Sequence, residues 1–379
     1  MNHFITNIVQ QTLTIDGHAY TAADCRDRLY NDFCRHYGLD SFHARLAEFL
    51  QEWFDSSETV RVHTSGSTGT PKELRVEKRR MMASAMMTVD FLGLQKGDTA
   101  LLCMPLQYIA GKMVVVRSLV AELNLLPVTP SGHPLKDLPE APVFAALIPM
   151  QVFNSLQVPA EAALLKDIRQ LIIGGGSIDA SLGEVLRTFP HAVWSTYGMT
   201  ETLSHIAMRR LSGPEASEGY TPFPGVSVST SPEGTLVIHA PAVNPDTLVT
   251  NDLVEFDAQG RFRILGRRDN TINTGGVKIQ IEQVEDALRP HLPFPFIITS
   301  VPDAKFGECI VLLVENTRTD DPLISPAIAA LPPYWRPKQV FSVSQLPKTG
   351  TGKPDRATAR SLAKELALPP LSASPSCSR

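Results

Sequence analysis

Short apolar runs alternate with helix-like stretches from Val60 onward, and this alternation constrains the fold more than any other feature of the sequence. In the clearest unit, an apolar run at 168–173 leads into glycines at 174–176 and a helix-like stretch at about 178–188. A second apolar run follows at 192–197. This order is typical of a βαβ unit, whose two strands lie parallel. The alternation therefore predicts an α/β fold with mostly parallel sheets, in which ligands bind at the carboxyl ends of the strands.

The length of the chain, 379 residues, exceeds what one ordinary compact core holds and predicts more than one domain. We expect a large N-terminal domain over 1–268 and a small α+β domain over 269–366, because the pattern changes to short strands and turns before this boundary. The first 58 residues show a helical pattern, clearest over 41–54, and no recognisable chemistry. The last residues, 367–379, are low in complexity, and we expect a disordered tail there.

Charge, cysteine usage and hydropathy narrow the range of partners. The formal net charge of -4 provides no basic surface field, which argues against nucleic acid as a partner. The five cysteines are odd in number and free of any Cys-x-x-Cys pair, as is typical of reduced thiols without a zinc site. Charged residues interrupt the most apolar stretch, 101–128, so we expect no membrane span and a cytoplasmic location.

A loop rich in glycine and hydroxyl side chains follows the first apolar run and ends in a lysine. Glycines allow successive backbone amides to converge on an anion, the hydroxyls add donors, and the lysine adds a positive charge. The pattern predicts a triphosphate clamp, and a flexible turn of the same composition is the alternative. It is not a Walker A loop, which requires Gly-Lys-Ser/Thr at the start of a helix. The clamp residues are Thr64, Ser65, Gly66, Ser67, Thr68, Gly69 and Lys72.

Two turns at strand ends carry groups suited to a nucleotide. Directly after one predicted strand, Tyr197 can stack on a base and Glu201 can hold a metal ion bound to phosphates. After the neighbouring strand, Gly175 and Gly176 allow a flat ring to approach the backbone closely. Each motif is weak by itself, because a structural Tyr and Glu or a tight βα turn would look the same.

Two further motifs lie later in the chain. Asp252 offers a carboxylate for ribose hydroxyls, and Arg267 offers a planar fork for ribose or phosphate oxygens; a surface ion pair is the alternative. Lys353 ends a glycine-rich loop, Pro-Lys-Thr-Gly-Thr-Gly-Lys, near the C-terminus. Lysines in such loops are usually only solvated, so this motif is indecisive alone.

Together, in this order and spacing, these motifs resemble the adenylate-forming superfamily of acyl-CoA synthetases, luciferases and peptide-synthetase adenylation domains. The resemblance runs from about Val60 to Arg356, and its most specific pieces are TSGSTGTPK, YGMTET, GRRDNTINTGGVKI and PKTGTGK. It implies an acid–thiol ligase that uses ATP and Mg²⁺ to activate a carboxylic acid as its acyl-adenylate and transfers the acyl group to coenzyme A. It also implies that residues 1–268 bind ATP and the acid, and that residues 269–366 form a mobile domain.

The resemblance assigns roles by position. Lys353 would neutralise charge at the α-phosphorus, with Thr200 at the α-phosphate and Glu201 at the magnesium ion. The loop at 64–72 would hold the β- and γ-phosphates. The other implied residues are Gly175, Gly176 and Tyr197 around adenine, Asp252 and Arg267 at the ribose, Asp269 at the hinge, and Gly275 and Gly276 at the pantetheine tunnel.

Two departures from the family pattern matter. Thr250-Asn251-Asp252 stands where the family usually has Thr-Gly-Asp, which keeps the carboxylate and alters the turn. The N-terminal region is also much shorter than the family norm. This shortening bears on the walls of the acid pocket and on oligomer contacts, where a homodimer is one option, more than on the chemistry.

Within the superfamily the chain most resembles the o-succinylbenzoate:CoA ligases of menaquinone biosynthesis, through the stretches MPLQYIAGKMVVVRSL, ALIPMQVFNSL, STYGMTETLSHIA and LVTNDLV. That substrate has two carboxylates, and a buried spectator carboxylate needs a cation or several donors. We expect Lys112 or His205 to meet it, directly or through water, with Gln151 as a polar wall. A Lys112 that lies along the surface and a hydrogen-bonded core His205 are the alternatives.

Three other functions stay open. They are another acyl- or aryl-CoA ligase, an adenylation domain that loads a carrier protein, and a catalytically silent nucleotide-binding protein. Retention of Glu201, Asp252 and Lys353 together argues against silence. The acceptor thiol is not encoded in any residue that we can name.

Overall fold

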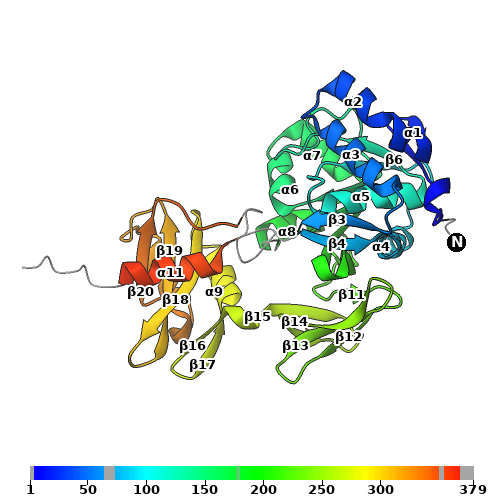
Figure 1. Cartoon of the computed structure of the whole chain (residues 1–379). Coiled ribbons are helices and arrows are strands. Elements are labelled where there is room, and N and C mark those ends of the chain that lie inside the picture. The colour runs from blue at the N-terminus through cyan, green and yellow to red at the C-terminus, as the bar shows by residue number, and fades with distance from the viewer. Residues whose placement is uncertain (1–3, 64–72, 177, 179, 350–353, 368–379) are drawn as a thin grey trace, which may run out of the picture. The chain divides into compact units, whose positions relative to one another are not determined.

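The computed structural model describes residues 4–63, 73–176, 178, 180–349 and 354–367. These residues form two compact units (Figure 1). The first unit includes the described residues between 4 and 250 together with 255–263. The second includes residues 251–254 and the described residues from Ile264 onward. Within the described ranges, no helix is long and apolar enough to cross a membrane.

The central sheet of the first unit is built from β1 (Thr12–Ile15), β2 (His18–Thr21), β5 (Thr99–Leu102), β6 (Asn124–Pro127), β7 (Phe144–Leu147), β8 (Gln170–Ile173), β9 (Ala192–Gly198), β10 (His205–Arg210) and β11 (Thr221–Pro222). Their order is β11-β10-β9-β8-β7-β5-β6-β1-β2. The strands from β9 to β1 pair parallel, whereas β2 at one edge and β10 and β11 at the other pair antiparallel. The predicted α/β fold with a mostly parallel sheet is therefore confirmed.

Helices cover both faces of this sheet: α4 (Lys78–Leu92) and α5 (Ile109–Ala121) on one, and α6 (Pro149–Leu156), α7 (Pro159–Asp167) and α8 (Ala180–Arg187) on the other. Successive side chains of a strand point to opposite faces, so alternate residues meet different helices. Leu101, Ala145 and Leu171 pack in one apolar cluster with residues of α6, α7 and α8. Their strand neighbours are buried on the opposite face, where α5 contacts β1, β5 and β6: Ala100, Leu102, Phe144 and Ile172.

The N-terminal segment contributes strands as well as the predicted helices. The 3₁₀ turn η1 (Ile8–Gln10) precedes β1 and β2, and three helices follow: α1 (Ala22–Asp27), α2 (Leu29–Tyr37) and α3 (Phe42–Phe54). At the start of α3, the Ser41 side chain accepts a hydrogen bond from the Ala44 amide. Near its end, buried Trp53 donates to Gln11 Oε1 at 2.8 Å, which ties α3 to the segment before β1. The segment is thus part of the central sheet.

Two smaller sheets carry site motifs. β3 (Thr59–His63) and β4 (Glu73–Glu77) pair antiparallel, with His63 opposite Glu73. The predicted triphosphate loop, 64–72, connects them and lies outside the described residues. In the other sheet, neighbouring strands are also consecutive in the chain: β12 (Ser227–Thr230), β13 (Thr235–Ala240), β14 (Asn244–Phe256) and β15 (Phe262–Arg267).

The second unit is an α+β domain with η3 (Arg268–Asn270), β16 (Thr271–Thr274), β17 (Val277–Gln280), α9 (Ile281–Leu288), β18 (Phe296–Asp303), β19 (Gly307–Glu315), α10 (Ile324–Ala330), η4 (Pro333–Trp335), β20 (Gln339–Val343) and α11 (Arg356–Ala367). Its strands pair in the order β17-β16-β19-β18, and β20 pairs with β19. Alternate residues of β19 face two layers: Ile310 and Leu312 pack with α9 and α10, and Val311 and Leu313 pack with α11. Figure 1 shows α11 lying across β18, which it contacts.

Two helical glycines allow a matched test of the packing in the first unit. A Cβ added at Gly111 in α5 would lie 2.7 Å from the Pro105 carbonyl oxygen, whereas one at Gly183 in α8 would meet nothing within 4 Å. We expect Gly111→Ala to lower the free energy of unfolding by about 1–3 kcal/mol, because the helix must move away from its neighbour. Gly183→Ala gains helix propensity without a clash and should raise it by about 0.5–1 kcal/mol.

Urea unfolding of the two variants measures both changes. A stabilised Gly111→Ala, or a Gly183→Ala that loses stability, would contradict the packing described for α5 and α8.

Candidate active site

The turn after β9 carries the residues predicted for phosphate and magnesium. β9 ends at Gly198, and the 3₁₀ turn η2 (Thr200–Thr202) follows. A Cβ at Gly198 would lie 2.2 Å from the Ser204 carbonyl oxygen and 2.5 Å from the His205 Cα. Only glycine lets the chain fold back this closely, so the glycine of the Tyr-Gly-Met-Thr-Glu motif is a steric requirement of the turn.

The same turn is strained at Leu203, where φ is +65°. The Ser204 amide donates to the Thr202 carbonyl oxygen at 2.7 Å, which closes a γ-turn of the rare, strained kind. The fully buried Thr202 hydroxyl accepts a hydrogen bond from the Met199 amide at 3.0 Å and lies 2.7 Å from the Ser204 carbonyl oxygen. Backbone strain of this type costs about 1–3 kcal/mol and is concentrated at functional sites. The strain is therefore a second, independent sign that this turn has a functional role.

Thr200 is half-buried and Glu201 is exposed. The backbone of Glu201 is fixed, because its carbonyl oxygen accepts a hydrogen bond from Asn244 Nδ2 at 3.0 Å. The described residues contain no cluster of three or more carboxylate, thiol or imidazole groups able to hold a metal ion. Proteins commonly bind Mg²⁺ through one or two carboxylates together with substrate phosphates. The exposed Glu201 carboxylate fits this mode of binding, in which a nucleotide carries the magnesium ion.

The residues expected around adenine lie at neighbouring strand ends. β8 and β9 are adjacent and parallel, so Gly175, after β8, and Tyr197, near the end of β9, share one edge of the sheet. Gly175 has a φ of +79°, and a Cβ there would lie 3.3 Å from the Ile148 side chain. The half-buried Tyr197 ring packs edge-on against Phe262, with ring centroids 5.2 Å apart. A glycine backbone and an aromatic ring at one edge suit contact with a flat heterocycle.

Within the second unit, Arg267 joins the residues predicted for the ribose and the hinge. Its guanidinium donates two hydrogen bonds to Asp269, at 2.9 and 2.8 Å, and lies 3.4 Å from Asp252. The hydrogen bond from Arg267 lowers the pKa of Asp269. Asn251 Oδ1 accepts a hydrogen bond from Arg268 at 3.0 Å, which a glycine would not provide. The asparagine of Thr-Asn-Asp thus adds a contact to the turn and leaves the Asp252 carboxylate beside Arg267.

Lys112 and Gln151 make their contacts within the protein. The Lys112 ammonium donates to the Arg61 carbonyl oxygen and lies 3.5 Å from Glu52 Oε2. Burial lowers the pKa of Lys112, and the charge of Glu52 opposes this shift. Gln151 caps the start of α6 and donates to the Ser131 carbonyl oxygen at 2.9 Å. Neither side chain depends on a ligand for its hydrogen bonds.

Two of the predicted groups, the loop at 64–72 and Lys353, lie outside the described residues.

Gly275 and Gly276 form the turn between β16 and β17, with φ values of +59° and +84°. Glycine adopts such values without steric cost, so the backbone of this turn explains both glycines.

A buried cation, which we did not predict as a site residue, lies beside the turn after β9. Arg117 on α5 is 2% exposed, and its Nη2 donates to Ser204 Oγ at 2.7 Å. Its Nε has no hydrogen-bond partner, and its charge has no carboxylate partner, among the described residues. Burial lowers the pKa of Arg117 to about 9, which leaves the guanidinium charged at neutral pH. The signal in the sequence is an arginine inside the apolar run 113–120, whose other residues are all buried.

His205 belongs to the same cluster and is neutral at physiological pH. Its Nε2 lies 2.9 Å from Thr88 Oγ1, and its Nδ1 lies 3.2 Å from Ser204 Oγ. Burial, and to a lesser extent the charge of Arg117, lowers the pKa of His205 well below its usual value. The positive charge of this cluster therefore resides on Arg117.

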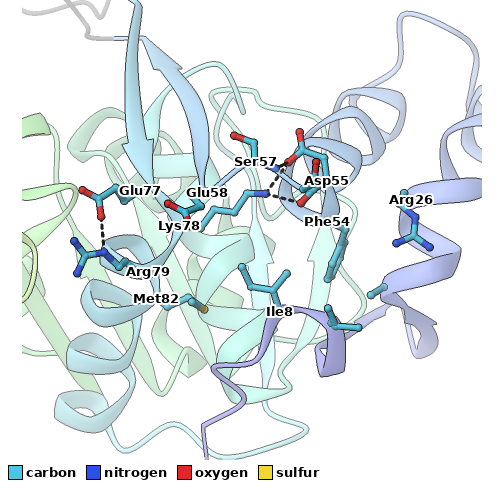
Figure 2. Close-up of a pocket in the computed structure, with 13 residues that line it drawn as sticks. Ile8, Arg26, Phe54, Asp55, Ser57, Glu58, Glu77, Lys78, Arg79 and Met82 are labelled. Atoms are coloured by element: carbon cyan, nitrogen blue, oxygen red, sulfur yellow. Dashed lines mark hydrogen bonds and ion pairs between the residues drawn. The ribbon is translucent and has the colours of Figure 1, made fainter.

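A separate pocket of about 440 Å³ lies where α3 ends and α4 begins (Figure 2). None of the predicted site residues lines it. In Figure 2 the buried Lys78 side chain points toward Asp55, and the ammonium lies 2.8 Å from that carboxylate. The ion pair joins the end of α3 to the start of α4, and we assign the pocket no part in the chemistry.

The buried His205 makes stability depend on pH. Its pKa is lower in the folded chain than the usual 6.5, so the unfolded chain binds protons more readily and stability falls as the pH drops below 6.5. We expect a loss of up to about 1.4 kcal/mol per pH unit between about pH 6.5 and 5. In His205→Asn this part of the slope should disappear.

Urea unfolding at several pH values measures the slope, and His239→Asn, at an exposed strand position, is the matched control. Equal slopes for the wild-type protein and His205→Asn would contradict a neutral, buried His205.

Comparisons with known proteins agree with this geometry. The family model described as AMP-binding enzyme matches residues 49–233. The probable 2-succinylbenzoate–CoA ligase of Mycobacterium tuberculosis (strain H37Rv) is 30% identical over 339 residues, in an alignment that covers 81% of this chain and 85% of the relative. The 2-succinylbenzoate–CoA ligase of Listeria monocytogenes is 26% identical over 340 residues, in an alignment that covers 82% of this chain and 71% of the relative.

Solved structures extend the likeness to the fold. An acyl-CoA synthetase (AMP-forming)/AMP-acid ligase II-like protein from Dyadobacter fermentans is 33% identical, with a TM-score of 0.59 over 84% of this chain and 94% of that one. The o-succinylbenzoate coenzyme A synthetase of Bacillus subtilis, solved with ATP and a magnesium ion, shares the fold, with a TM-score of 0.71, 17% identity and coverage of 93% and 97%. The resemblance carried by the motifs is confirmed, and this chain belongs to the family of AMP-binding enzymes.

Proposed function

We propose that this protein is an AMP-forming acid–CoA ligase that converts 2-succinylbenzoate, also called o-succinylbenzoate, into its coenzyme A thioester in menaquinone biosynthesis. The motifs and the relatives named 2-succinylbenzoate–CoA ligase support the reaction. The structural observation that carries the choice of a diacid is Arg117, a buried charge beside the turn that follows β9.

The reaction begins with an unreactive carboxylate, whose charge and resonance oppose attack by a thiol. ATP supplies AMP as the leaving group: an acid oxygen bonds to the α-phosphorus and pyrophosphate departs. The coenzyme A sulfur then bonds to the acyl carbon and AMP departs. In this proposal Thr200 contacts the α-phosphate, Glu201 holds the magnesium ion, and Lys353 neutralises the charge that develops at phosphorus.

The other predicted residues keep their proposed roles in binding. Asp269 is the hinge residue about which the second unit turns between the two half-reactions. The binding residues are Thr64, Ser65, Gly66, Ser67, Thr68, Gly69 and Lys72 for the phosphates, Gly175, Gly176 and Tyr197 for adenine, Asp252 and Arg267 for the ribose, and Gly276 for pantetheine.

The electrostatics of Arg117 favour an anionic ligand. Removing a guanidinium from water costs several kcal/mol unless an opposite charge and hydrogen bonds compensate. Ser204 supplies one hydrogen bond, and Nε lacks a partner among the described residues. A spectator carboxylate, bound directly or through water, would supply the missing acceptor and the opposite charge. Neutral His205, which shares Ser204, would then be a hydrogen-bonding neighbour and not the cation.

We also propose that the protein works in the cytoplasm, with the carboxylic acid and coenzyme A as its small-molecule partners and with a homodimer as one option for its assembly. The cysteines that the structure describes, Cys25, Cys34, Cys103 and Cys309, are free, as expected in a reducing compartment. Light scattering of the purified protein tests the homodimer.

Incubation of the purified protein with ATP, Mg²⁺, coenzyme A and 2-succinylbenzoate tests the reaction. We expect mass spectrometry to detect 2-succinylbenzoyl-CoA together with AMP and pyrophosphate. Without coenzyme A, ATP–pyrophosphate exchange should still depend on the acid.

A panel of other acids is the control. Preference for a different acid would identify another acyl- or aryl-CoA ligase, and transfer only to a carrier protein would identify a loading domain. Absence of exchange with every acid would leave a silent nucleotide-binding protein.

Arg117→Met tests the carboxylate subsite. We expect the KM for 2-succinylbenzoate to rise at least about tenfold, because a buried charged hydrogen bond contributes about 1.5–3 kcal/mol. The rise should be much smaller for an analogue that lacks the carboxylate that is not activated. Lys112→Met is the matched comparison. A rise in KM for this variant alone would show that Lys112, and not Arg117, binds the carboxylate that is not activated.

A further inference from the structure

We propose that α11 positions two backbone segments that serve different half-reactions, through two arginines one helical turn apart. Arg356 acts through Glu285 on Pro354 and Asp355, the described residues that follow Lys353 in the chain, and Arg360 acts through Glu308 on the turn at Gly275. This inference rests on the proposed function, which gives Lys353 to adenylation and the glycine turn to thioester formation. Neither arginine touches a substrate, so both are positioning residues.

The first anchor is a buried, bidentate ion pair. Glu285 on α9 is 7% exposed, and its two oxygens accept hydrogen bonds from Arg356 Nη1 and Nη2 at 2.5 and 2.8 Å. The same carboxylate accepts a hydrogen bond from the Ile298 amide at 2.9 Å, at the start of β18. Two parallel hydrogen bonds fix the orientation of a guanidinium as well as its distance. The first residue of α11 is therefore fixed to both α9 and the sheet.

The described backbone just before α11 is held by two further contacts. Lys348 and Pro354 pair as an isolated antiparallel bridge. The Asp355 amide also donates to the Pro347 carbonyl oxygen at 3.0 Å. Pro354 is the next residue after Lys353 in the chain, so the anchored backbone ends one peptide bond from the proposed catalytic lysine.

The second anchor joins α11 to the glycine turn. Glu308 in β19 accepts hydrogen bonds from Arg360 and from Ser300 Oγ on one oxygen, and from the Asn273 amide at 3.1 Å on the other. Asn273 lies in β16, two positions before Gly275.

The glycine turn is held on its other side by Phe306. The Gly275 amide donates to the Phe306 carbonyl oxygen at 2.8 Å, and a Cβ at Gly275 would lie 3.1 Å from the Phe306 ring. Movement of the Glu308 carboxylate therefore displaces the strand that leads into this turn.

The two anchors predict opposite effects on adenylation and on thioester formation, which mutations can test separately. Glu285→Gln keeps the volume of the side chain but removes the charge that orients Arg356. We expect the kcat of acid-dependent ATP–pyrophosphate exchange to fall at least about tenfold, since small misplacements of a catalytic group have effects of this size. Thioester formation from supplied acyl-adenylate and coenzyme A should change less than about twofold by the same argument, because Lys353 has no part in it. Arg356→Lys, which retains the charge but lacks the planar fork for two parallel hydrogen bonds, should lie between Glu285→Gln and wild type.

Glu308→Gln should give the opposite pattern. Thioester formation should fall at least about tenfold and exchange by less than about twofold. Lys353→Ala is the reference for a pure adenylation defect.

Arg336→Gln is the control for a structural role. Arg336 is in the same unit and donates to the Leu331 and Ala329 carbonyl oxygens at 2.8 Å, which belong to neither anchor. It should lower the melting temperature without changing the ratio of the two half-reactions.

Equal losses in both half-reactions for Glu285→Gln and Glu308→Gln, or no loss in either, would overturn the inference and leave the ion pairs as structural. If the wild-type protein makes neither acyl-adenylate nor thioester, the proposed function fails first and the inference fails with it.

Discussion

The tight turn in which the chain folds back after β9, from Gly198 to Ser204, is the constraint on which the site of the first unit depends. At Gly198 the backbone of Ser204 comes closer than any Cβ allows, and the parallel sheet changes there to its antiparallel edge. The strained Leu203 between them is maintained because Thr202 and Ser204 both have buried partners. Tertiary contacts thus offset a local conformational cost, and the same turn carries the proposed phosphate and magnesium residues.

Periodicity predicted the central sheet because burial on both faces turns each parallel strand into an apolar run. It did not predict β1 and β2, which are four residues long and precede a strongly helical segment. The signal that was available is the Asp16-Gly17 pair between them. Both residues have positive φ, +47° and +81°, as in the tight turn that Asp-Gly favours in hairpins.

Motifs predicted the parts of the site that depend on local backbone geometry, such as the glycines at strand ends. They did not predict Arg117, because its burial and its contact with Ser204 join positions 87 residues apart. The contact between Lys112 and Glu52 spans 60 residues and was equally invisible in the sequence. Local patterns identify groups with a suitable chemistry, whereas tertiary packing decides which of them retains an unbalanced charge.

The guanidinium of Arg267 is shared between two carboxylates, and sharing has a thermodynamic consequence. Asp269 accepts hydrogen bonds from Nε and Nη2, while Asp252 lies 3.4 Å from Nη1 of the same guanidinium. In the proposed roles, a bound ribose adds a third acceptor to this guanidinium, so nucleotide binding is linked to the contact between Arg267 and the hinge residue. Linkage is reciprocal, so a backbone change at Asp269 must alter nucleotide affinity by the same factor. If the proposed roles hold, this one side chain couples the release of AMP to the rotation of the second unit.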